Sequence, residues 1–308
     1  MIKRTLYFGN PAYLSLANSQ LVISRPSDGD LPPDDQSIVV KTVPIEDIGV
    51  VVLDNRQITI TSCLVSELLN NNIALVTCDE KSLPIGLMLP LHANTLQSER
   101  FQDQLEASLP LRKQLWQQTV EAKIRNQAGV LKKVTGANAR NMLAWAGSVK
   151  SGDSDNMEAR AAAFYWKNIF PELDSFTRDR YGSAPNNLLN YGYAILRAVI
   201  ARSLVATGLL PTLGIHHHNR YNSYCLADDI MEPYRPYVDS LVVDIMADNP
   251  CPQLTRDIKV KLLSIPVLDV NIDGHRSPLM IATATTTASL YKCFSGVSRK
   301  IIYPDLNE

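Results

Sequence analysis

Residues 226–239 read LADDIMEPYRPYVD, a stretch that places several acidic side chains where a helix begins. Asp229 and Glu232 are three positions apart, so a helix puts them on one face, where they are able to share a cation. Pro233 and Pro236 follow at once and predict a kink or break beside these acids, because proline lacks an N–H and clashes with the preceding turn. An acidic helix N-terminus without any ligand has the same composition, so this stretch leaves both interpretations open.

Helical patterns extend in both directions from this stretch. From about Ser98 onward, apolar residues recur at helical spacing within long polar segments, which is typical of amphipathic helices. A helix is expected to begin near Met157, another to span residues 187–208, and the acidic stretch to continue as a helix to about Ala247. We therefore expect a large all-α domain over residues 98–308.

The first ninety residues have a different pattern, made of short runs rich in β-branched residues. Local alternation within the runs and turn residues between them predict strands. The predicted strands are Gln20–Arg25, Ser37–Val43, Gly49–Leu53, Gln57–Thr61, Ile73–Cys78 and Pro84–Leu89. A short helix is predicted at Ser62–Asn70, where leucines recur at helical spacing. Strands at this spacing predict a small β-sandwich over residues 1–91, so the fold class is α+β, with the β domain followed by the larger α domain.

The composition is that of an ordinary globular protein, with 45% hydrophobic and 20% charged residues in a chain of 308. Five cysteines without a CxxC pair favour reduced thiols over a disulfide framework or a zinc ribbon. The N-terminus MIKRTLYFGN lacks the apolar core of a signal peptide, and Arg197 and Arg202 interrupt the apolar stretch 193–215. We expect a cytoplasmic protein that has no membrane partner.

Charge is unevenly distributed along the chain, although the net charge is only −1. Residues 1–90 hold 6 basic and 10 acidic side chains, residues 100–150 hold 9 and 3, and residues 151–250 hold 8 and 12. A basic block beside an acidic one suits a metal-dependent DNA enzyme, because the first neutralises phosphates and the second concentrates carboxylates around cations. A solvated helix face with a chance excess of basic residues is the simpler alternative.

The segment MEARAAAFYW places Glu158 on a helix whose i+3 and i+4 positions are Ala161 and Ala162. A face of small residues lets another helix approach closely, so we expect this carboxylate to be partly buried. Burying a lone carboxylate is unfavourable unless it is paired or bound to a cation. The alternative is an exposed glutamate in the first turn that stabilises the helix dipole.

Three consecutive histidines, His216, His217 and His218, form an internal run. Imidazole is a good ligand for divalent metals and a base near neutral pH. Three successive side chains cannot all face one metal ion from regular structure, so we expect one or two ligands at most. Surface histidines with structural hydrogen bonds are the alternative, and the lack of a PCxxC motif argues against a zinc deaminase site.

Together these motifs resemble those of a known family. The matching segments are AKIRNQ (122–127), MEARAAAFYW (157–166), APNNLLNYGYAIL (184–196), GLLPTLGIHHHN (208–219) and LADDIMEPYRPYVD (226–239). In this order they are similar to the CRISPR-associated spacer-acquisition integrase and endonuclease, the Cas-one family, and most closely to its type II branch. The family's small β domain agrees with the β-rich N-terminus, so the resemblance extends over essentially the whole chain.

The resemblance implies a set of site residues. The family's helix glutamate matches Glu158, its metal-binding histidine matches His217, and its last acid, aspartate in many relatives, matches Glu232. These three are the expected ligands of Mg²⁺ or Mn²⁺, and Asp229, in the preceding acidic position, completes the catalytic set. Further basic side chains are expected to contact DNA, chiefly through phosphates. They are Lys123, Arg125, Lys132, Lys133, His216, His218 and Arg235.

The implied reaction is a transesterification, in which the 3′-hydroxyl of a captured DNA fragment attacks a phosphodiester at the edge of a CRISPR repeat. The implied partners are double-stranded DNA (prespacer and repeat), a second copy of the chain bound through residues 1–91, the small Cas-two protein, and other type II adaptation and effector proteins. A repair-type nuclease acting on branched DNA and a non-catalytic DNA-binding scaffold are the alternatives. The ordered presence of all ligand types argues against the scaffold, whereas the sequence does not exclude the nuclease.

Overall fold

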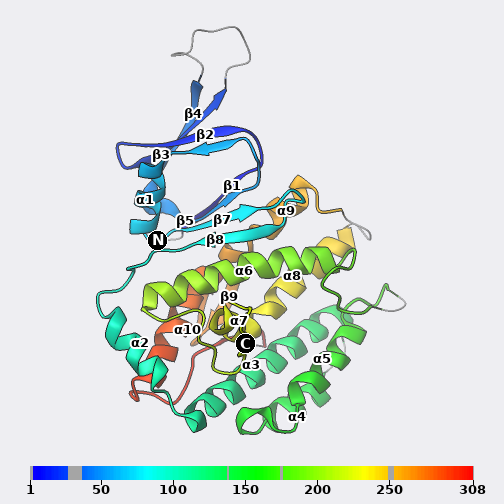
Figure 1. Ribbon diagram of the computed structural model, residues 1–308. Coiled ribbons are helices and arrows are strands. Elements are labelled where there is room, and N and C mark those ends of the chain that lie inside the picture. The colour runs from blue at the N-terminus through cyan, green and yellow to red at the C-terminus, as the bar shows by residue number, and fades with distance from the viewer. Residues whose placement is uncertain (1–2, 27–36, 137–138, 174–175, 249–252, 308) are drawn as a thin grey trace. The chain divides into compact units, whose positions relative to one another are not determined.

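The computed structural model describes residues 3–26, 37–136, 139–173, 176–248 and 253–307. The chain divides into two compact units, Met1–Ala93 and Asn94–Glu308 (Figure 1). The first unit contains most of the strands, and the second contains most of the helices. The expected α+β fold, with strands in sheets followed by a larger, mostly helical region, is confirmed.

The first unit holds two four-stranded sheets with the strand orders β1-β5-β7-β8 and β4-β3-β2-β6. In the first sheet, β1, β5 and β7 run parallel and β8 is antiparallel to β7. In the second sheet, β3 is antiparallel to β2 and β4, and β2 is parallel to β6. The elements are β1 Arg4–Phe8, β2 Ala12–Ala17, β3 Gln20–Pro26, β4 Ser37–Pro44, η2 Ile45–Asp47, β5 Ile48–Leu53, β6 Ile58–Ile60, α1 Ser62–Asn70, β7 Ala74–Cys78 and β8 Pro84–Met88.

An apolar core shared by both sheets and α1 explains why these elements assemble. Leu21 of β3, Ile48 of β5, and Leu64 and Leu68 of α1 belong to one buried cluster. The two leucines of α1 are four residues apart and therefore lie on the same helix face. The helix begins where it does because the Thr61 hydroxyl accepts a hydrogen bond from the backbone N–H of Leu64.

Two strands of this unit, β1 and β2, were not predicted from the sequence. Each has a parallel partner far along the chain, since Arg4 pairs with Ile48 and Ala12 pairs with Ile58. Such partners leave no local pattern. The β2–β3 hairpin does have a local sequence signal, the dipeptide Asn18-Ser19 between the two strands. Both turn residues have positive φ, of 51° and 57°.

The second unit is built mainly of helices. They are α2 Gln97–Leu105, α3 Leu109–Thr135, α4 Arg140–Gly147, α5 Met157–Asn168, α6 Asn186–Thr207, α7 Cys225–Met231, α8 Arg235–Asp248, α9 Arg256–Leu262 and α10 Leu279–Phe294, with the 3₁₀ turns η3 Ser151–Asp153, η4 Glu232–Tyr234 and η5 Ile265–Val267.

This unit is not entirely helical, because it also contains a small three-stranded sheet with the order β10-β9-β11. The strands are β9 Asp269–Ile272, β10 His275–Pro278 and β11 Pro304–Asp305. Asp273 and Gly274 connect β9 to β10 with φ of 53° and 73°, the conformation of a two-residue hairpin turn. The dipeptide Asp-Gly is the local signal that the sequence prediction of an all-α domain overlooked.

Helix α6 is the core helix of the second unit, and it matches the helix predicted over residues 187–208. By length and hydropathy it is the one helix among the described residues able to cross a membrane, but 72% of its apolar window is buried inside the protein. Gly192 allows α8 to pack closely on it, since a Cβ at this position would lie 2.5 Å from Val238 Cγ1. The apolar character of α6 therefore reflects packing.

The chain break predicted beside Pro233 is confirmed. The helix expected from residue 228 begins slightly earlier, at Cys225, and α7 ends at Met231. The turn η4 then carries Pro233 before α8 begins. A helical N–H would be missing at Pro233, so the tighter turn accommodates the proline and redirects the chain.

A buried asparagine anchors this break to α3. Asn126 is fully buried and donates hydrogen bonds to the carbonyl oxygens of Pro233 (2.8 Å) and Pro304 (3.0 Å). Its own carbonyl oxygen accepts the backbone N–H of Leu306 at 2.9 Å. One side chain thus joins α3, η4 and the C-terminal segment, and so fixes the backbone next to Glu232.

Candidate functional site

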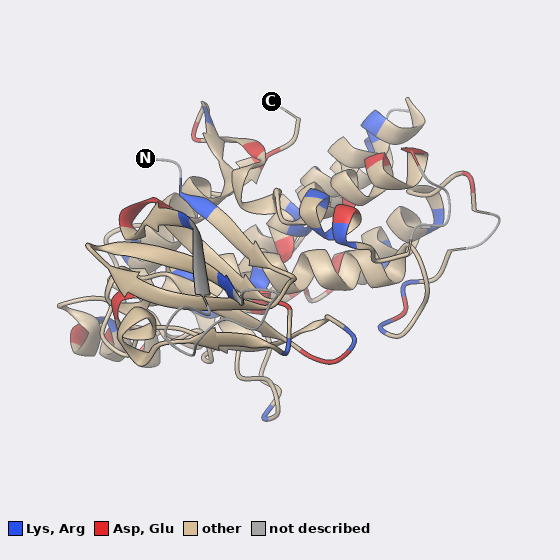
Figure 2. Ribbon diagram, turned by 90° about the horizontal axis from the view of Figure 1, so that it is seen from above, with Lys and Arg blue, Asp and Glu red and all other residues tan. Residues whose placement is uncertain are grey.

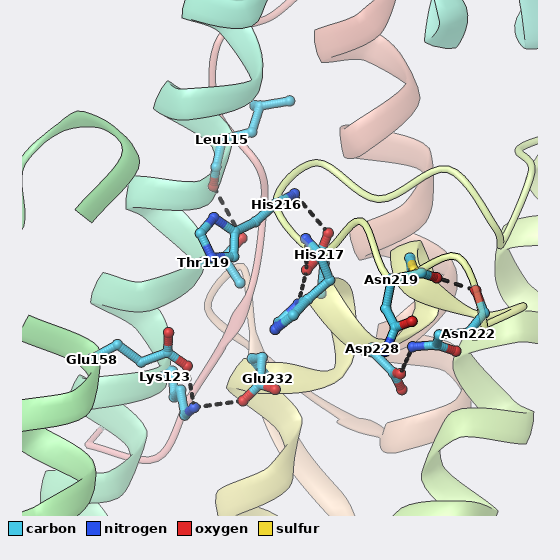
Figure 3. Close-up of polar contacts among 12 residues, drawn as sticks. Leu115, Thr119, Lys123, Glu158, His216, His217, Asn219, Asn222, Asp228 and Glu232 are labelled. Atoms are coloured by element: carbon cyan, nitrogen blue, oxygen red, sulfur yellow. Dashed lines mark hydrogen bonds and ion pairs between the residues drawn. The ribbon is translucent and has the colours of Figure 1, made fainter. Parts of the chain in front are cut away.

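Five segments of the helical unit bring the predicted site residues together (Figure 3). Glu158 lies in the first turn of α5, and Glu232 begins η4. His217 lies in the loop between α6 and α7, while Asp229 lies on α7. Lys123 projects from α3 to a position between the two glutamates. Residues far apart in the sequence therefore form one cluster.

Lys123 is the cation that both glutamates contact. Its Nζ lies 2.6 Å from Glu158 Oε1 and 2.6 Å from Glu232 Oε2. Arg235 supplies a second cation, whose Nη2 lies 3.0 Å from Glu232 Oε1. The side chains of Lys123, Glu158 and Glu232 are only 12%, 23% and 4% exposed, so water screens these charges weakly.

The charged forms of this cluster stabilise one another. Burial lowers the pKa of Lys123, but the charges of Glu232 and Glu158 raise it by more, so its pKa ends above the ordinary value. Burial raises the pKa of Glu232, but Arg235 and Lys123 lower it by more, so its pKa ends below the ordinary value. Lys123 and Glu232 are therefore both ionised at neutral pH.

Asp153 stabilises the start of α5, the helix that carries Glu158 in its first turn. The Oδ1 atom of Asp153 accepts the backbone N–H of Met157 at 2.8 Å, and its Oδ2 atom accepts that of Glu158 at 3.0 Å. These two N–H groups have no acceptor inside α5, because they belong to its first turn. Asp153 was not selected from the sequence.

Asp229 organises the loop that carries His216 and His217. It is fully buried, and its Oδ1 atom contacts His217 Nδ1. Its two oxygens also accept the backbone N–H groups of His216 (2.9 Å) and His217 (3.2 Å). Gly214 permits this arrangement, because a Cβ there would lie 2.8 Å from Asp229 Oδ2 and would also collide with the His217 carbonyl oxygen.

The contact with Asp229 fixes how the His217 ring is turned. The other ring nitrogen points toward the gap between Glu158 and Glu232 (Figure 3). The hydrogen bond with Asp229 is the main cause that raises the pKa of His217, and burial opposes it. A carboxylate bonded to the far nitrogen is the usual support of a metal-ligating histidine, since it sets the tautomer and the ring orientation.

The neighbouring histidines have different surroundings. The ring of His216 is stacked on Trp116 of α3, with 4.1 Å between centroids and an interplanar angle of 3°. Burial lowers the pKa of His216, which favours the neutral ring. His218 is exposed. Trp116 was missed in the sequence because a buried tryptophan on an amphipathic helix looks like any other core residue.

The predicted phosphate contacts fall into two groups. Lys123 and Arg235 lie within the buried charge cluster. Arg125, Lys132 and Lys133 are exposed on α3, and acidic neighbours pair with the first and the last of them. Figure 2 shows basic and acidic segments interspersed along the helices. The basic block of the sequence is thus divided between the site and the exposed side of α3.

A second buried network, made of hydrogen bonds to Asp239, lies next to the site. Asp239 of α8 is buried and accepts hydrogen bonds from the hydroxyl groups of Tyr165 (2.9 Å) and Tyr193 (2.5 Å). The guanidinium of Arg235 lies over the Tyr193 ring, 4.9 Å from its centroid. Because Arg235 also contacts Glu232, the network connects α5, α6 and α8 to the charge cluster. None of its tyrosines was selected from the sequence.

The residues present suit a divalent cation, although they do not surround an ion as they stand. Within the described ranges, no three His, Cys, Asp or Glu side chains are grouped closely enough to hold a metal. The ammonium group of Lys123 nevertheless lies between Glu158 and Glu232, and His217 is directed at the same gap. The buried Oε2 atom of Glu232 already binds a cation, the Lys123 ammonium group at 2.6 Å. Carboxylate and imidazole donors suit Mg²⁺ and Mn²⁺.

Fold and site together define a class of two-unit proteins, in which a β-sandwich precedes a helical unit that gathers glutamate, histidine and a second acid around one cation position. A family model described as "CRISPR associated protein Cas1" matches residues 6–253. The chain therefore belongs to the Cas1 family.

Individual relatives agree with this assignment. The CRISPR-associated endonuclease Cas1 of Neisseria meningitidis serogroup C (strain 8013) is 39% identical over 285 residues, which cover 92% of this chain and 89% of the relative. A casposase bound to its integration product has the same fold, with a TM-score of 0.78 at 19% identity over 100% of this chain and 94% of that one. A chain of a Cas6-RT-Cas1–Cas2 complex has a TM-score of 0.73 at 19% identity, covering 97% of this chain and 35% of the other.

The Asp239 network predicts a pH-dependent stability. Burial raises the pKa of Asp239 to about 6, against smaller opposing effects of the Tyr193 and Tyr165 hydroxyls and of Arg235 and Arg178. Between about pH 4 and about pH 6 the folded protein therefore retains a proton that the unfolded chain has released. As pH rises through this window, the wild-type protein loses stability relative to Asp239→Asn, by about 2–3 kcal/mol. Denaturant unfolding of both proteins at pH 4.5 and pH 7 measures this difference, and a difference independent of pH would contradict the prediction.

Proposed function

We propose that this protein is a metal-dependent DNA integrase that inserts new spacers into a CRISPR array. The observation that carries the proposal is the convergence of Glu158, Glu232 and His217 on one cation position. In the proposed reaction the 3′-hydroxyl of a DNA fragment attacks a phosphodiester at the repeat edge and displaces a 3′-hydroxyl of the array. One phosphodiester replaces another, so no nucleotide hydrolysis is needed.

The residues of the site have separate roles in this proposal. Glu158, His217 and Glu232 would hold Mg²⁺ or Mn²⁺, which would supply charge stabilisation for the oxygens of the reacting phosphate. Asp229 keeps the His217 ring in place and holds the loop backbone. A cavity of ≈ 240 Å³ adjoins His217, and Arg112, His218 and Arg220 are among its lining residues. Its partly basic lining suits a DNA strand that approaches the site.

Two relatives support DNA chemistry of this kind. The Neisseria relative is named an endonuclease, and the casposase structure is described as bound to an integration product. Water in place of the 3′-hydroxyl would turn strand transfer into strand cleavage at the same site. The name of the Neisseria relative therefore keeps a nuclease acting on branched DNA as the second candidate function.

Removing either glutamate charge tests the proposed chemistry. Glu158→Gln and Glu232→Gln are each expected to lower strand transfer by about 100-fold or more, since each removes a charged ligand without changing side-chain volume. His217→Ala is expected to have a comparable effect, whereas His218→Ala should not. The assay joins a labelled 3′-hydroxyl fragment to a supercoiled plasmid carrying a repeat, with the small Cas2 partner and saturating Mn²⁺.

Glu106→Gln is the matched control, because it neutralises an exposed glutamate of the same unit that lies outside the site. Its strand transfer should equal that of the wild-type protein. Wild-type rates for Glu158→Gln or Glu232→Gln would reject the site assignment. Cleavage of branched DNA without any joined product, in the wild-type protein, would favour the nuclease.

The exposed side of α3 is the proposed DNA-contacting surface. Lys132 and Lys133 lie in its last turn, and phosphate contacts by lysine make affinity fall with salt. Lys132→Ala with Lys133→Ala should flatten the slope of log affinity against log salt by about 2. Lys41→Ala with Lys81→Ala removes the same charge from the acidic β unit and should leave the slope unchanged. Equal slopes for all three proteins would place the DNA path elsewhere.

Assembly is proposed to supply the second site that integration needs. A spacer is joined at both ends, whereas the glutamate–histidine arrangement described above supplies one cation position. We therefore propose a homodimer through the β unit, working with a Cas2 partner and, in a type II system, with its further adaptation and effector proteins. The edge strand β8 exposes Ile85 and Met88, and apolar edges favour association. The Cas1–Cas2 complex among the structural neighbours supports the partner.

The dimer is tested by light scattering at micromolar concentration. The expected mass is twice the 34.2 kDa of one chain. Ile85→Lys with Met88→Lys should shift the protein toward the monomer, because charges on an edge strand oppose pairing. Val297→Lys, at an exposed apolar position of the helical unit, is the control. A wild-type protein that is strictly monomeric would reject the dimer.

A further inference from the structure

Lys123 has an unusual position for a lysine of a DNA-binding protein. Its ammonium group is equidistant, at 2.6 Å, from a carboxylate oxygen of α5 and one of η4. The side chain is 12% exposed, and α3 delivers it to the gap between the two carboxylates (Figure 3). Two elements that share no backbone hydrogen-bond ladder are thus joined through one positive charge.

The charges around this lysine are balanced. Glu158 and Glu232 contribute two negative charges, and Lys123 and Arg235 contribute two positive ones. Arg235 approaches only the Oε1 atom of Glu232, whereas Lys123 occupies the space between the two carboxylates. An added divalent cation would therefore compete with the ammonium group for the same oxygens, and not with the guanidinium.

Lys123 and Arg235 also differ in how easily they can leave the carboxylates that they contact. A lysine ammonium is a compact point charge on a flexible four-carbon stem, whereas a guanidinium is a planar fork. Arg235 is held further by its stacking on Tyr193. Lys123 is consequently the group that is able to move away while the carboxylates remain in place.

We propose that Lys123 is an internal counter-cation that keeps Glu158 and Glu232 together in the metal-free protein and withdraws from them when a divalent cation binds. This inference rests on the proposed metal-dependent function. Lys123 is then a positioning residue, which preserves the carboxylate pair and lowers the affinity for metal. The buried Oε2 atom of Glu232, which Lys123 Nζ contacts at 2.6 Å, is the oxygen that would pass from the ammonium group to the metal ion.

The test is a Mn²⁺ titration of the full-length Lys123→Met protein by isothermal calorimetry. Methionine retains the approximate length of the stem and removes the charge. The dissociation constant for Mn²⁺ is expected to fall by about 10-fold or more, because the competing cation is gone and two carboxylates are left unbalanced. Without metal, the melting temperature should fall below that of the wild-type protein, and the rise on adding Mn²⁺ should be larger. An unchanged or weaker Mn²⁺ affinity would overturn the proposal.

Two further variants separate this role from a general effect of losing a lysine. Lys123→Arg keeps the charge and should retain the melting temperature of the metal-free protein and the weak Mn²⁺ affinity. Lys133→Met removes an exposed lysine of the same helix and should leave both quantities unchanged. A Lys133→Met protein that binds Mn²⁺ as tightly as Lys123→Met would overturn the proposal, since the effect would then be one of overall charge.

A measurement on the wild-type protein covers the case in which Lys123→Met does not fold. Withdrawal from the carboxylates exposes the ammonium group, so labelling of Lys123 by an amine-reactive ester, mapped by mass spectrometry, should rise several-fold on adding Mn²⁺. Labelling of Lys133 serves as the internal reference. No rise at Lys123 in protein that binds Mn²⁺ would overturn the proposal. A wild-type protein that binds no Mn²⁺ at all would instead reject the proposed metal-dependent function.

Discussion

The close approach of two like-charged carboxylates, one buried and one partly buried, is the constraint on which the helical unit depends. Two carboxylate charges that contact one ammonium group repel each other, and removing them from water adds a further cost. Glu158 and Glu232 are tolerated because Lys123 and Arg235 lie against them. The helix α3 must therefore hold its lysine in a fixed place relative to α5 and η4.

Asn126 shows how the fold meets that requirement. It lies three residues after Lys123 on α3 and bonds the Pro233 carbonyl, which adjoins Glu232. The same side chain captures the C-terminal segment through Pro304 and Leu306. A charge contact and a hydrogen-bond contact from one turn of α3 thus act on consecutive residues of η4. The position of the acid is set by backbone bonding as well as by electrostatics.

Sequence patterns located the parts of this site but not their connections. The acids, the histidine run and the proline break all leave local signals, and the structure brings Glu158, His217 and Glu232 to one place. Lys123 was selected as a phosphate contact from its positive charge, and its contacts with two carboxylates depend on packing between distant helices. Asp239 and its tyrosines were missed for the same reason, since burial alone gives them their role.

The proline break also explains why Asp229 and Glu232, three residues apart, make different contacts. On an unbroken helix Asp229 and Glu232 would share one face. Here α7 ends between them, so Asp229 remains on a helix beside the histidine loop while Glu232 starts a 3₁₀ turn directed at α3. Asp229 binds backbone N–H groups and the His217 ring, and Glu232 binds cations. Asp229 therefore orients the His217 ring, whereas Glu232 pairs with the side-chain cations of α3 and α8, a difference that the spacing of the two acids did not indicate. The residue that separates the two roles is Pro233, which has no charge.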